Sequence, residues 1–463
     1  MKRFLTLFFT VMLCAILLCG CGASCEHEYG DYKIDVYPTD MDDGSRTRTC
    51  AKCGNTETEA FSASVGLDLF YREEENLYVL QGIGECTDAV IVIPRAYVTH
   101  DAEYTVVVIS SDAFKGCKYI REVIIPEGVR VIGNRAFNYC PSLKKVHIPS
   151  TVERIGTEVF NSSANVEIDV SEDNPYYSGT GNCLVEKASG TLISGFNSSV
   201  IPDDLGIKKI APFAFYKCNE LKEITIPESV TEIGEEAFAW CETLTKATVK
   251  GAETIGYSAF GYCYALESVE LPKNLKTIGA AAFTHAAIRE LVIPEGTERI
   301  EQSAFSHCEK LETVDMADSV TFIGTSAFGN CHKLSRIELP ADLTEIGTFA
   351  FYQCTSLRSL TIPSGVRNVK EQTFAGCASL LSVTALGAES IGNSAFAGCY
   401  RLAEIALPKT LKKIDGSAFY NCGAITSVSF EGTKTEWEAI ANDDRQLKNL
   451  TVKCADGNVE ASN

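Results

Sequence analysis

The chain has 463 residues, a formal net charge of −20 and a hydrophobic content of 45%, so it is long and apolar enough to bury an extensive core. This acidic balance excludes non-specific nucleic-acid binding, which depends on Lys and Arg for contacts with phosphates. It favours solubility instead, and we expect no nucleic-acid partner.

The first residues predict export. Lys2 and Arg3 precede an apolar run, residues 4–18, that is too short to span a bilayer. The run ends in Leu-Cys-Gly-Cys, which resembles a bacterial lipobox with cleavage before Cys21. We therefore expect residues 1–20 to be a lipoprotein signal peptide and Cys21 to carry a lipid. The mature chain would be extracytoplasmic, surface exposed and tethered by the lipid alone. The alternative is ordinary secretion with cleavage elsewhere.

Residues 21–60 are expected to form the anchor and a small Cys/His module. Cys25-Glu-His27 is followed by Cys50-Ala-Lys-Cys53, and Cys-x-x-Cys places two thiolates on one tight turn. Together these four side chains predict a structural zinc site with a closed coordination sphere. The module resembles small zinc-ribbon-like units. A pair of disulfides or a Cys50–Cys53 redox pair remains the alternative in an extracytoplasmic segment.

Residues 61–113 alternate apolar and polar side chains between turn signals, as in 77–80, 90–93 and 105–109. This pattern predicts an N-terminal β cap that covers the exposed edge of the following array.

The main body of the chain, residues 114–430, repeats one unit of the form Ile-Gly-x-x-Ala-Phe-x-x-Cys-x-x-Leu-x-x-Ile-x-Ile-Pro. Its phenylalanines recur every 22 or 23 residues outside one gap, at Phe114, Phe137, Phe160, Phe215, Phe238, Phe260, Phe283, Phe305, Phe328, Phe351, Phe374, Phe396 and Phe419. A fixed period of this length predicts a solenoid whose units share a continuous core.

Within one unit, Ile224 and Ile226 are expected to point inward from a strand of a parallel sheet that ends at Pro227. A short extended piece then leads to a corner at Gly234, and residues 235–241 are expected to form a single helical turn.

Cysteines follow the phenylalanines by three residues in most units, and this column is interrupted at Ser163 and Ala286. An even repeat does not offer the paired geometry that disulfides need. We therefore expect these cysteines to be reduced and to act as small buried apolar residues.

Two segments depart from the repeat. Residues 161–214 are expected to form an elaborated rung with a projecting hairpin, because residues 183–193 contain two strands around a Ser-Gly turn. Residues 431–463 are expected to form a C-terminal cap, with a short helix at 434–441 and an edge strand at 451–454.

With these motifs in place, residues 65–457 resemble the BspA-like class of bacterial leucine-rich repeat surface proteins. The resemblance implies a mainly β, right-handed solenoid with a parallel sheet on one face, short extended pieces and single helical turns elsewhere, and caps at both ends. It also implies a surface adhesin or interaction protein, and it implies no particular ligand.

No catalytic set is visible in the sequence, which lacks a Gly-x-Ser-x-Gly elbow, a Walker loop and a His-Glu-x-x-His motif. We therefore expect a protein that is not an enzyme. The outward sheet residues are polar and nearly free of aromatics, which favours a protein partner over a sugar. That partner would be a protein on the surface of a host cell or of a neighbouring cell.

A candidate binding ridge lies two residues after successive phenylalanines, at Trp240, Tyr262, His285 and His307, with Tyr264 nearby. Aromatic side chains in register are typical of binding hot spots. Alternatively, they stack on one another for structural reasons. The leading hypothesis is a lipid-anchored protein that binds another protein through the sheet face or this ridge. The alternative is a carbohydrate-binding or cell-wall-associated module.

Overall fold

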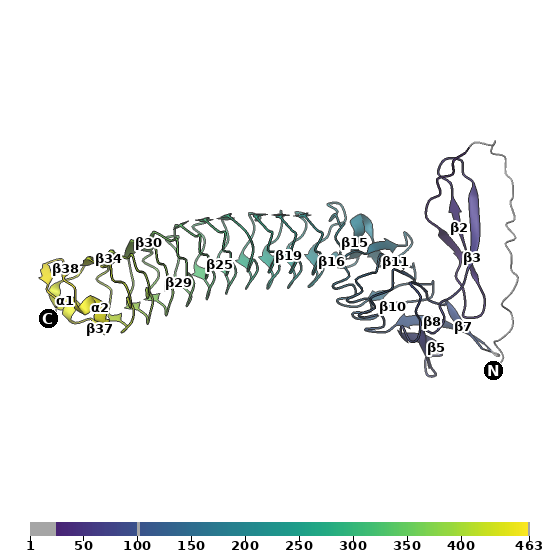
Figure 1. Ribbon diagram of the computed structural model, residues 1–463, viewed down its shortest axis with the longest axis horizontal. Helices are drawn as coiled ribbons and strands as arrows, with labels where there is room; N and C mark the ends of the chain where they lie inside the picture. The colour runs from purple at the N-terminus through teal and green to yellow at the C-terminus, as the bar shows by residue number, and fades with distance from the viewer. Residues whose placement is uncertain (1–24, 100–101, 462–463) are drawn as a thin grey trace.

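The computed structural model describes residues 25–99 and 102–461, and these form an elongated, curved β-solenoid (Figure 1). A typical rung adds a strand of two to four residues to a first parallel ladder and a two-residue strand to a second, and each ladder is divided along its length into several hydrogen-bonded sheets. The prediction of a mainly β solenoid with parallel sheets is confirmed. The expected Cys21 lipidation site lies outside the described residues.

The first ladder contains the longer strands. They are β6 (Val90–Val92), β9 (Glu122–Ile124), β11 (Lys145–Ile148), β13 (Glu167–Val170), β18 (Glu223–Ile226), β20 (Lys246–Val249), β22 (Ser268–Glu270), β24 (Glu290–Ile293), β26 (Thr313–Met316), β28 (Arg336–Ile337), β30 (Ser359–Ile362), β32 (Ser382–Ala385), β34 (Glu404–Leu407) and β36 (Ser427–Phe430).

The second ladder contains the short strands. They are β10 (Val131–Ile132), β12 (Arg154–Ile155), β17 (Lys209–Ile210), β19 (Glu232–Ile233), β21 (Thr254–Ile255), β23 (Thr277–Ile278), β25 (Arg299–Ile300), β27 (Phe322–Ile323), β29 (Glu345–Ile346), β31 (Asn368–Val369), β33 (Ser390–Ile391), β35 (Lys413–Ile414) and β37 (Ala441–Asn442).

Register follows the repeat, so equivalent side chains lie above one another. In β18, Ile224 and Ile226 are buried while Glu223 is exposed, and Ile224 pairs with Ala247 of the next rung. Behind the strands the phenylalanines stack with ring centroids 4.6–5.4 Å apart and planes within 14°. The expected phenylalanine column is therefore the core of the array.

The segment from Glu235 to Cys241 is not the single helical turn that we expected from the sequence. Glu236 and Trp240 have φ values of 49° and 61°, which no right-handed helix allows. The N–H groups of Glu236, Phe238 and Trp240 donate to carbonyls of the next rung over 2.7–2.9 Å. The segment is thus a run of tight turns that bonds to its neighbour as a strand would, because the left-handed residues direct alternate N–H groups along the stack.

The cysteine column is buried, and every cysteine that the structure describes is a free thiol, as expected. Most of these thiols donate to the carbonyl of the phenylalanine in the preceding rung over 3.1–3.4 Å, as Cys241 does to Phe215. At the exception Ser163, the hydroxyl donates in the same way to Phe137 over 2.8 Å. The position therefore favours a small hydrogen-bond donor, although Ala286 occupies it without one.

The elaborated rung holds β14 (Tyr177–Ser178), a 3₁₀ turn (Thr180–Asn182), β15 (Cys183–Glu186) and β16 (Thr191–Gly195). The β15–β16 hairpin is antiparallel, as expected. It does not project, however, because β16 pairs in parallel with β17 and both faces of β15 are buried. Side chains of β15 point alternately into two apolar clusters, Leu184 into the N-terminal one and Cys183 and Val185 into the C-terminal one. The β15–β16 hairpin therefore separates two apolar cores, and we call this hairpin the wall.

Both ends of the array are closed by antiparallel strands. At the N-terminal end, β4 (Asp68–Arg72) pairs with β5 (Leu77–Gly82), β5 joins β8 (Glu103–Ile109) in parallel, and β7 (Ala96–Val98) pairs with β8. At the C-terminal end lie α1 (Lys434–Glu438), α2 (Arg445–Lys448), β38 (Val452–Cys454) and β39 (Gly457–Val459). The expected edge strand, β38, is itself covered by β39.

A three-stranded antiparallel module stands beside the N-terminal end (Figure 1). It consists of β1 (Lys33–Val36), β2 (Gly44–Thr49) and β3 (Thr56–Phe61). The tip of its β1–β2 connection contacts β7, since Arg95 N–H donates to the Pro38 carbonyl and Val98 N–H to the Asp40 carboxylate. Across residues 25–99 and 102–461, no helix is long and apolar enough to cross a bilayer.

Candidate metal centre and aromatic ridge

Cys25, His27, Cys50 and Cys53 meet at the far end of the three-stranded module. One ligand atom from each lies within 4.8 Å of all the others, and Cys53 Sγ is 3.3 Å from His27 Nδ1. The four residues that the sequence singled out are therefore brought together by the fold.

Local backbone geometry explains how the cluster forms. Gly54 adopts a φ of +72° and its N–H donates to the Cys50 carbonyl over 2.9 Å, which closes a tight turn around the Cys-x-x-Cys pair. Tyr29 forms a β-bridge with Cys50 and thereby places the Cys25–His27 segment alongside that turn. Both pairs of donors consequently face the same point.

The thiols of the cluster differ in pKa. The pKa of Cys25 is raised to about 11, chiefly by its hydrogen bond with Cys53. Burial raises the pKa of Cys50, but bonds from His27 and from the N–H groups of Cys53 and Lys52 outweigh it and bring the pKa to about 6. Three sulfur atoms and one imidazole form a donor set typical of tetrahedral zinc. The cluster could therefore hold a metal ion.

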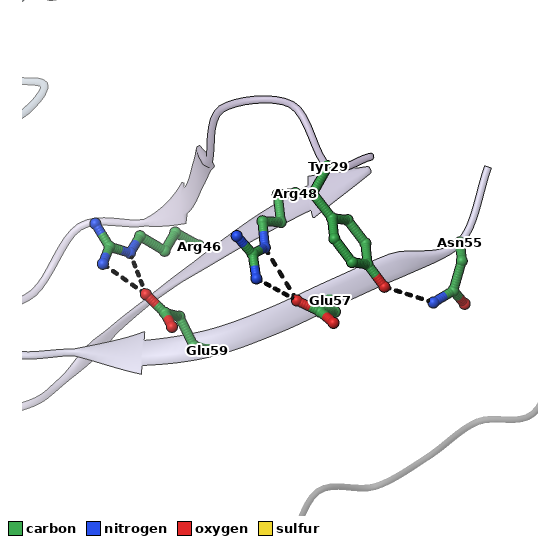
Figure 2. A network of polar contacts seen from close by, with 6 residues as sticks. All are labelled: Tyr29, Arg46, Arg48, Asn55, Glu57 and Glu59. Atoms are coloured by element: carbon green, nitrogen blue, oxygen red, sulfur yellow. Dashed lines mark hydrogen bonds and ion pairs between the residues drawn. The ribbon is translucent and has the colours of Figure 1, made fainter. Parts of the chain in front are cut away.

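The module has no apolar core of its own, since neither apolar cluster includes any residue from 25 to 61. Besides the backbone pairing of its strands, the module is held together by polar side-chain contacts, as Figure 2 shows. Arg48 binds Glu57 over 2.7 Å, Arg46 binds Glu59, and the Asn55 amide donates to the Tyr29 hydroxyl over 2.9 Å. Exposed pairs of this kind contribute little stability, so a bound metal would be the main stabilising element at this end.

We use "the ridge" for Trp240, Tyr262, His285 and His307, which lie on four consecutive rungs. Ring centroids are 4.3 Å apart for Trp240–Tyr262, 5.2 Å for Tyr262–His285 and 4.6 Å for His285–His307, with planes within 20°. Tyr264 meets the first three edge-on at 6.1–6.3 Å. The four ridge side chains are half-buried, so they stack on one another and still present an aromatic edge to solvent.

Every ridge residue has a left-handed backbone, with φ between 59° and 61°. Bulky residues are uncommon in this conformation, which suits Gly and Asn better. At the same position other rungs place Asn330, Gly376, Gly398 and Asn421. Tyr139, Lys217 and Gln353 adopt the same conformation at this position, so the left-handed backbone belongs to the repeat and the aromatic side chains are what distinguish the ridge.

Electrostatics at the ridge favour the neutral form of its first histidine. Burial, with a further contribution from the neighbouring His307, lowers the pKa of His285. The protonated form of His285 is therefore disfavoured within the stack.

The sequence did not indicate a hollow that lies farther along the same column. It forms where Gly376 and Gly398 replace the side chains that occupy this position in earlier rungs, and Tyr352, Tyr400 and Tyr420 surround it. The available signal was two glycines in succession at a position that the preceding rungs, from Lys217 to Gln353, fill with larger side chains.

The comparisons agree with this architecture. The BspA type leucine rich repeat region matches residues 99–179, 193–312, 276–388 and 385–455, which together cover more than half of the chain. No curated protein matches the sequence.

Three solved structures illustrate the similarity. A leucine-rich repeat protein from Bacteroides ovatus is 26% identical with a TM-score of 0.51, covering 75% of this chain and 94% of that one. A leucine rich cell surface protein from Faecalibacterium prausnitzii is 26% identical with a TM-score of 0.43, covering 82% of this chain and 97% of that one. A leucine-rich repeat protein from Eubacterium ventriosum is 22% identical with a TM-score of 0.40, covering 58% and 74%. On the strength of the repeat match, the chain belongs to the BspA-type leucine-rich repeat family.

Proposed function

We propose that the protein is a non-catalytic, lipid-anchored cell-surface protein that binds another protein through the ridge. The observation that carries this proposal is the four-ring stack on left-handed residues, because aromatic hot spots are rigid and lose little entropy on binding. Rings that already stack on one another are held in place before a partner arrives.

The test is a double substitution, Trp240→Asn with Tyr262→Asn. Asn suits the left-handed backbone and already occupies this position at Asn330 and Asn421, so the array should stay folded. Partners captured by surface cross-linking on living cells are identified by mass spectrometry, and their binding to the purified protein is then measured. We expect the double variant to weaken binding at least tenfold.

Tyr139→Asn is the matched control. Tyr139 has the same register and a φ of 57°, is 53% exposed, and lies in the N-terminal part of the array away from the ridge. Unchanged partner affinity in the double variant, or an equal loss in the Tyr139 control, would count against the ridge as the binding surface.

We propose that the Cys/His cluster holds zinc in a structural role. Four protein ligands leave no open position, so the ion would supply folding free energy and no reaction chemistry. This agrees with a module that lacks an apolar core. Cobalt loading of the purified protein should give the visible absorption of a tetrahedral thiolate site. Cys53→Ser should abolish that absorption, whereas Cys454→Ser, at a buried thiol of the opposite end, should retain it. A protein with no bound metal and a Cys50–Cys53 disulfide would overturn the zinc assignment.

Lipid anchoring through Cys21 is likewise a proposal, supported by the lipobox-like sequence. Incorporation of labelled palmitate in the bacterial host tests it. Label should be lost in Cys21→Ala and retained in Cys19→Ala, whose cysteine lies two positions earlier. The assignment would be contradicted if both variants incorporate label. It would also be contradicted if the parent chain and both variants incorporate none.

A further inference from the structure

The hollow beside the ridge arises from a gap in one column of side chains. The position two residues after each phenylalanine is filled from Trp240 through Gln353, then holds Gly376 and Gly398, and is filled again by Asn421. A Cβ on Gly376 would lie 2.6 Å from the Gln353 amide, so that side chain covers the first glycine. At Gly398 the nearest atoms would be 3.8 Å away, which leaves room for a ligand. The resulting hollow has a volume of about 510 Å³.

The walls of this hollow are aromatic and its rim is uncharged. Tyr400 and Tyr420 are each 62% exposed, and the end of the Tyr400 ring approaches Gly398. Tyr264 occupies the same register as Tyr400 six rungs earlier, but there the ring packs against the ridge. Because glycine replaces the ridge side chain beside Tyr400, the face of that ring is free.

Polar groups at the rim are open to solvent. In the part of the chain that the structure describes, the side chains of Gln372 and Asn421 and the Tyr400 hydroxyl form no hydrogen bond within the protein. None of the residues that line the hollow is charged, although 22% of the chain is. Free aromatic faces with amide groups at the edge suit a neutral ring that carries several hydroxyls, since the apolar face packs on tyrosine and each amide both donates and accepts.

A second hollow, of about 500 Å³, adjoins the first. Thr355, Ala378 and Tyr400 line the tyrosine hollow, and the next residue in each case, Ser356, Ser379 and Arg401, lines the second. Successive Cα atoms are about 3.8 Å apart. The two hollows therefore run side by side across three rungs.

The second hollow gathers positive charge on an acidic protein. It is lined by Lys333, Arg358 and Arg401, and among the described residues none of these three forms a salt bridge. Glu312 is its one acidic lining residue and lies 3.9 Å from Arg289. Elsewhere among the described residues some cations, such as Lys370 and Lys412, pair with glutamates, whereas others, such as Arg121 and Arg154, form no salt bridge. What distinguishes this hollow is that three cations line it together on a chain with a net charge of −20. Such a group favours an anionic ligand, because guanidinium groups bind carboxylates and sulfates in bidentate fashion.

We propose that the two hollows together bind an acidic oligosaccharide. A neutral pyranose packs on Tyr400 and Tyr420 with its hydroxyls on Gln372 and Asn421, and the carboxylate or sulfate of the adjoining sugar binds Arg358, Arg401 and Lys333. This site lies beyond the ridge and is independent of the protein-binding function proposed above.

The experiment is an array of neutral, carboxylate-bearing and sulfated oligosaccharides, probed with the full-length protein and followed by titration of the best binder. Gly398→Asn fills the tyrosine hollow, and Asn is already accommodated at this position at Asn330 and Asn421 with φ values of 62° and 61°. We expect acidic glycans to bind, Gly398→Asn to weaken them at least tenfold, and Arg358→Gln with Arg401→Gln to weaken them similarly and to reduce the salt dependence of binding.

Two control variants distinguish this site from general electrostatic attraction and from the ridge. Arg121→Gln with Arg154→Gln removes two exposed arginines from the N-terminal part and should leave glycan binding unchanged. The ridge variant Trp240→Asn with Tyr262→Asn should also bind glycan normally, so failure of the ridge proposal and failure of this one are distinguishable. Thermal unfolding of each variant verifies folding.

The inference is overturned if no glycan binds. It is equally overturned if Gly398→Asn or the Arg358/Arg401 pair leaves binding unchanged, if neutral glycans bind as tightly as their acidic counterparts, or if a proline-rich acidic peptide displaces the glycan and binds more tightly.

Discussion

Replacing Phe328 with alanine should destabilise the array by about 4–5 kcal/mol. The ring is fully buried and lies between Phe305 and Phe351, with centroids 5.4 Å away on each side and planes within 10°. Truncating a buried phenylalanine to alanine typically costs about 3–5 kcal/mol through lost transfer free energy and the cavity left behind. Two aromatic contacts, each of about 0.5–1.5 kcal/mol, place the loss in the upper part of that range.

The loss should be local in origin, because each rung of a solenoid contacts only its neighbours. Urea unfolding monitored by the β-sheet circular dichroism signal measures it as a shift of the midpoint. Hydrogen exchange should show that the rungs beside Phe328 lose protection first.

Phe322→Ala is the matched control in the same rung. That ring is half-buried under Arg299, whose guanidinium carbon is 3.9 Å from the ring centroid, so its removal should cost about 1 kcal/mol or less. Equal losses in the two variants, or a loss below about 1 kcal/mol for Phe328→Ala, would refute the phenylalanine stack as the main source of stability.

Three further changes test other parts of the structure. Cys331→Ser should cost less than Cys331→Ala in urea unfolding, because Ser163 already makes the equivalent bond to a phenylalanine carbonyl; a larger loss for serine would contradict the donor role. Gly195→Ala should destabilise by about 1–3 kcal/mol, since a Cβ would lie 2.0 Å from the Phe215 ring, and a loss near zero in the same assay would show that the wall yields. The lowered pKa of His285 means that the folded state binds its proton less well than the unfolded state, so the stability contribution is present above about pH 6.5 and is lost as the pH falls below it. His285→Asn should therefore reduce the fall in melting temperature between pH 7 and pH 5, and an unchanged pH profile would contradict this.

The repeat allowed the ladders and the core to be predicted from the sequence. Apolar alternation fixed which side of each strand is buried, and the period of the phenylalanines fixed their stack. The Cys/His cluster was also predictable, because Cys-x-x-Cys closes on itself and the fold had only to bring Cys25 and His27 alongside.

The turn segment was mispredicted for an identifiable reason. Ala237 and Phe238 suit a helix, and the left-handed conformation falls on Glu236 and Trp240, residue types that seldom adopt it. Bonds to the next rung compensate for that cost, and a single unit read alone contains no sign of them. The two hollows were missed for a related reason. Gly398 forms part of the first hollow because it has no side chain, and Arg401 lines the second only together with residues from other rungs.

The hairpin of the elaborated rung was expected to project, whereas it divides the array. Cys183, Leu184 and Val185 are consecutive apolar residues, and such a run indicates a strand buried on both faces rather than an exposed one. At this wall Phe196 meets Phe160 edge-on at 5.7 Å, and the parallel stack begins again with Phe215 and Phe238.

This division separates two apolar cores along the chain. The N-terminal core contacts the polar module, whose Asp31 reaches Lys145 of β11 over 2.6 Å, so it holds the part of the protein nearest the expected anchor. The ridge and both hollows are formed by residues that follow the wall in the chain. Figure 1 shows these rungs, from β19 onward, on the C-terminal side of β15 and β16. Both the ladder of short strands and the aromatic stack are interrupted here: one sheet ends at β12, and the next begins with β14, β15 and β16 and continues through β17. The proposed binding surfaces can therefore change in sequence without altering the packing that supports the N-terminal end.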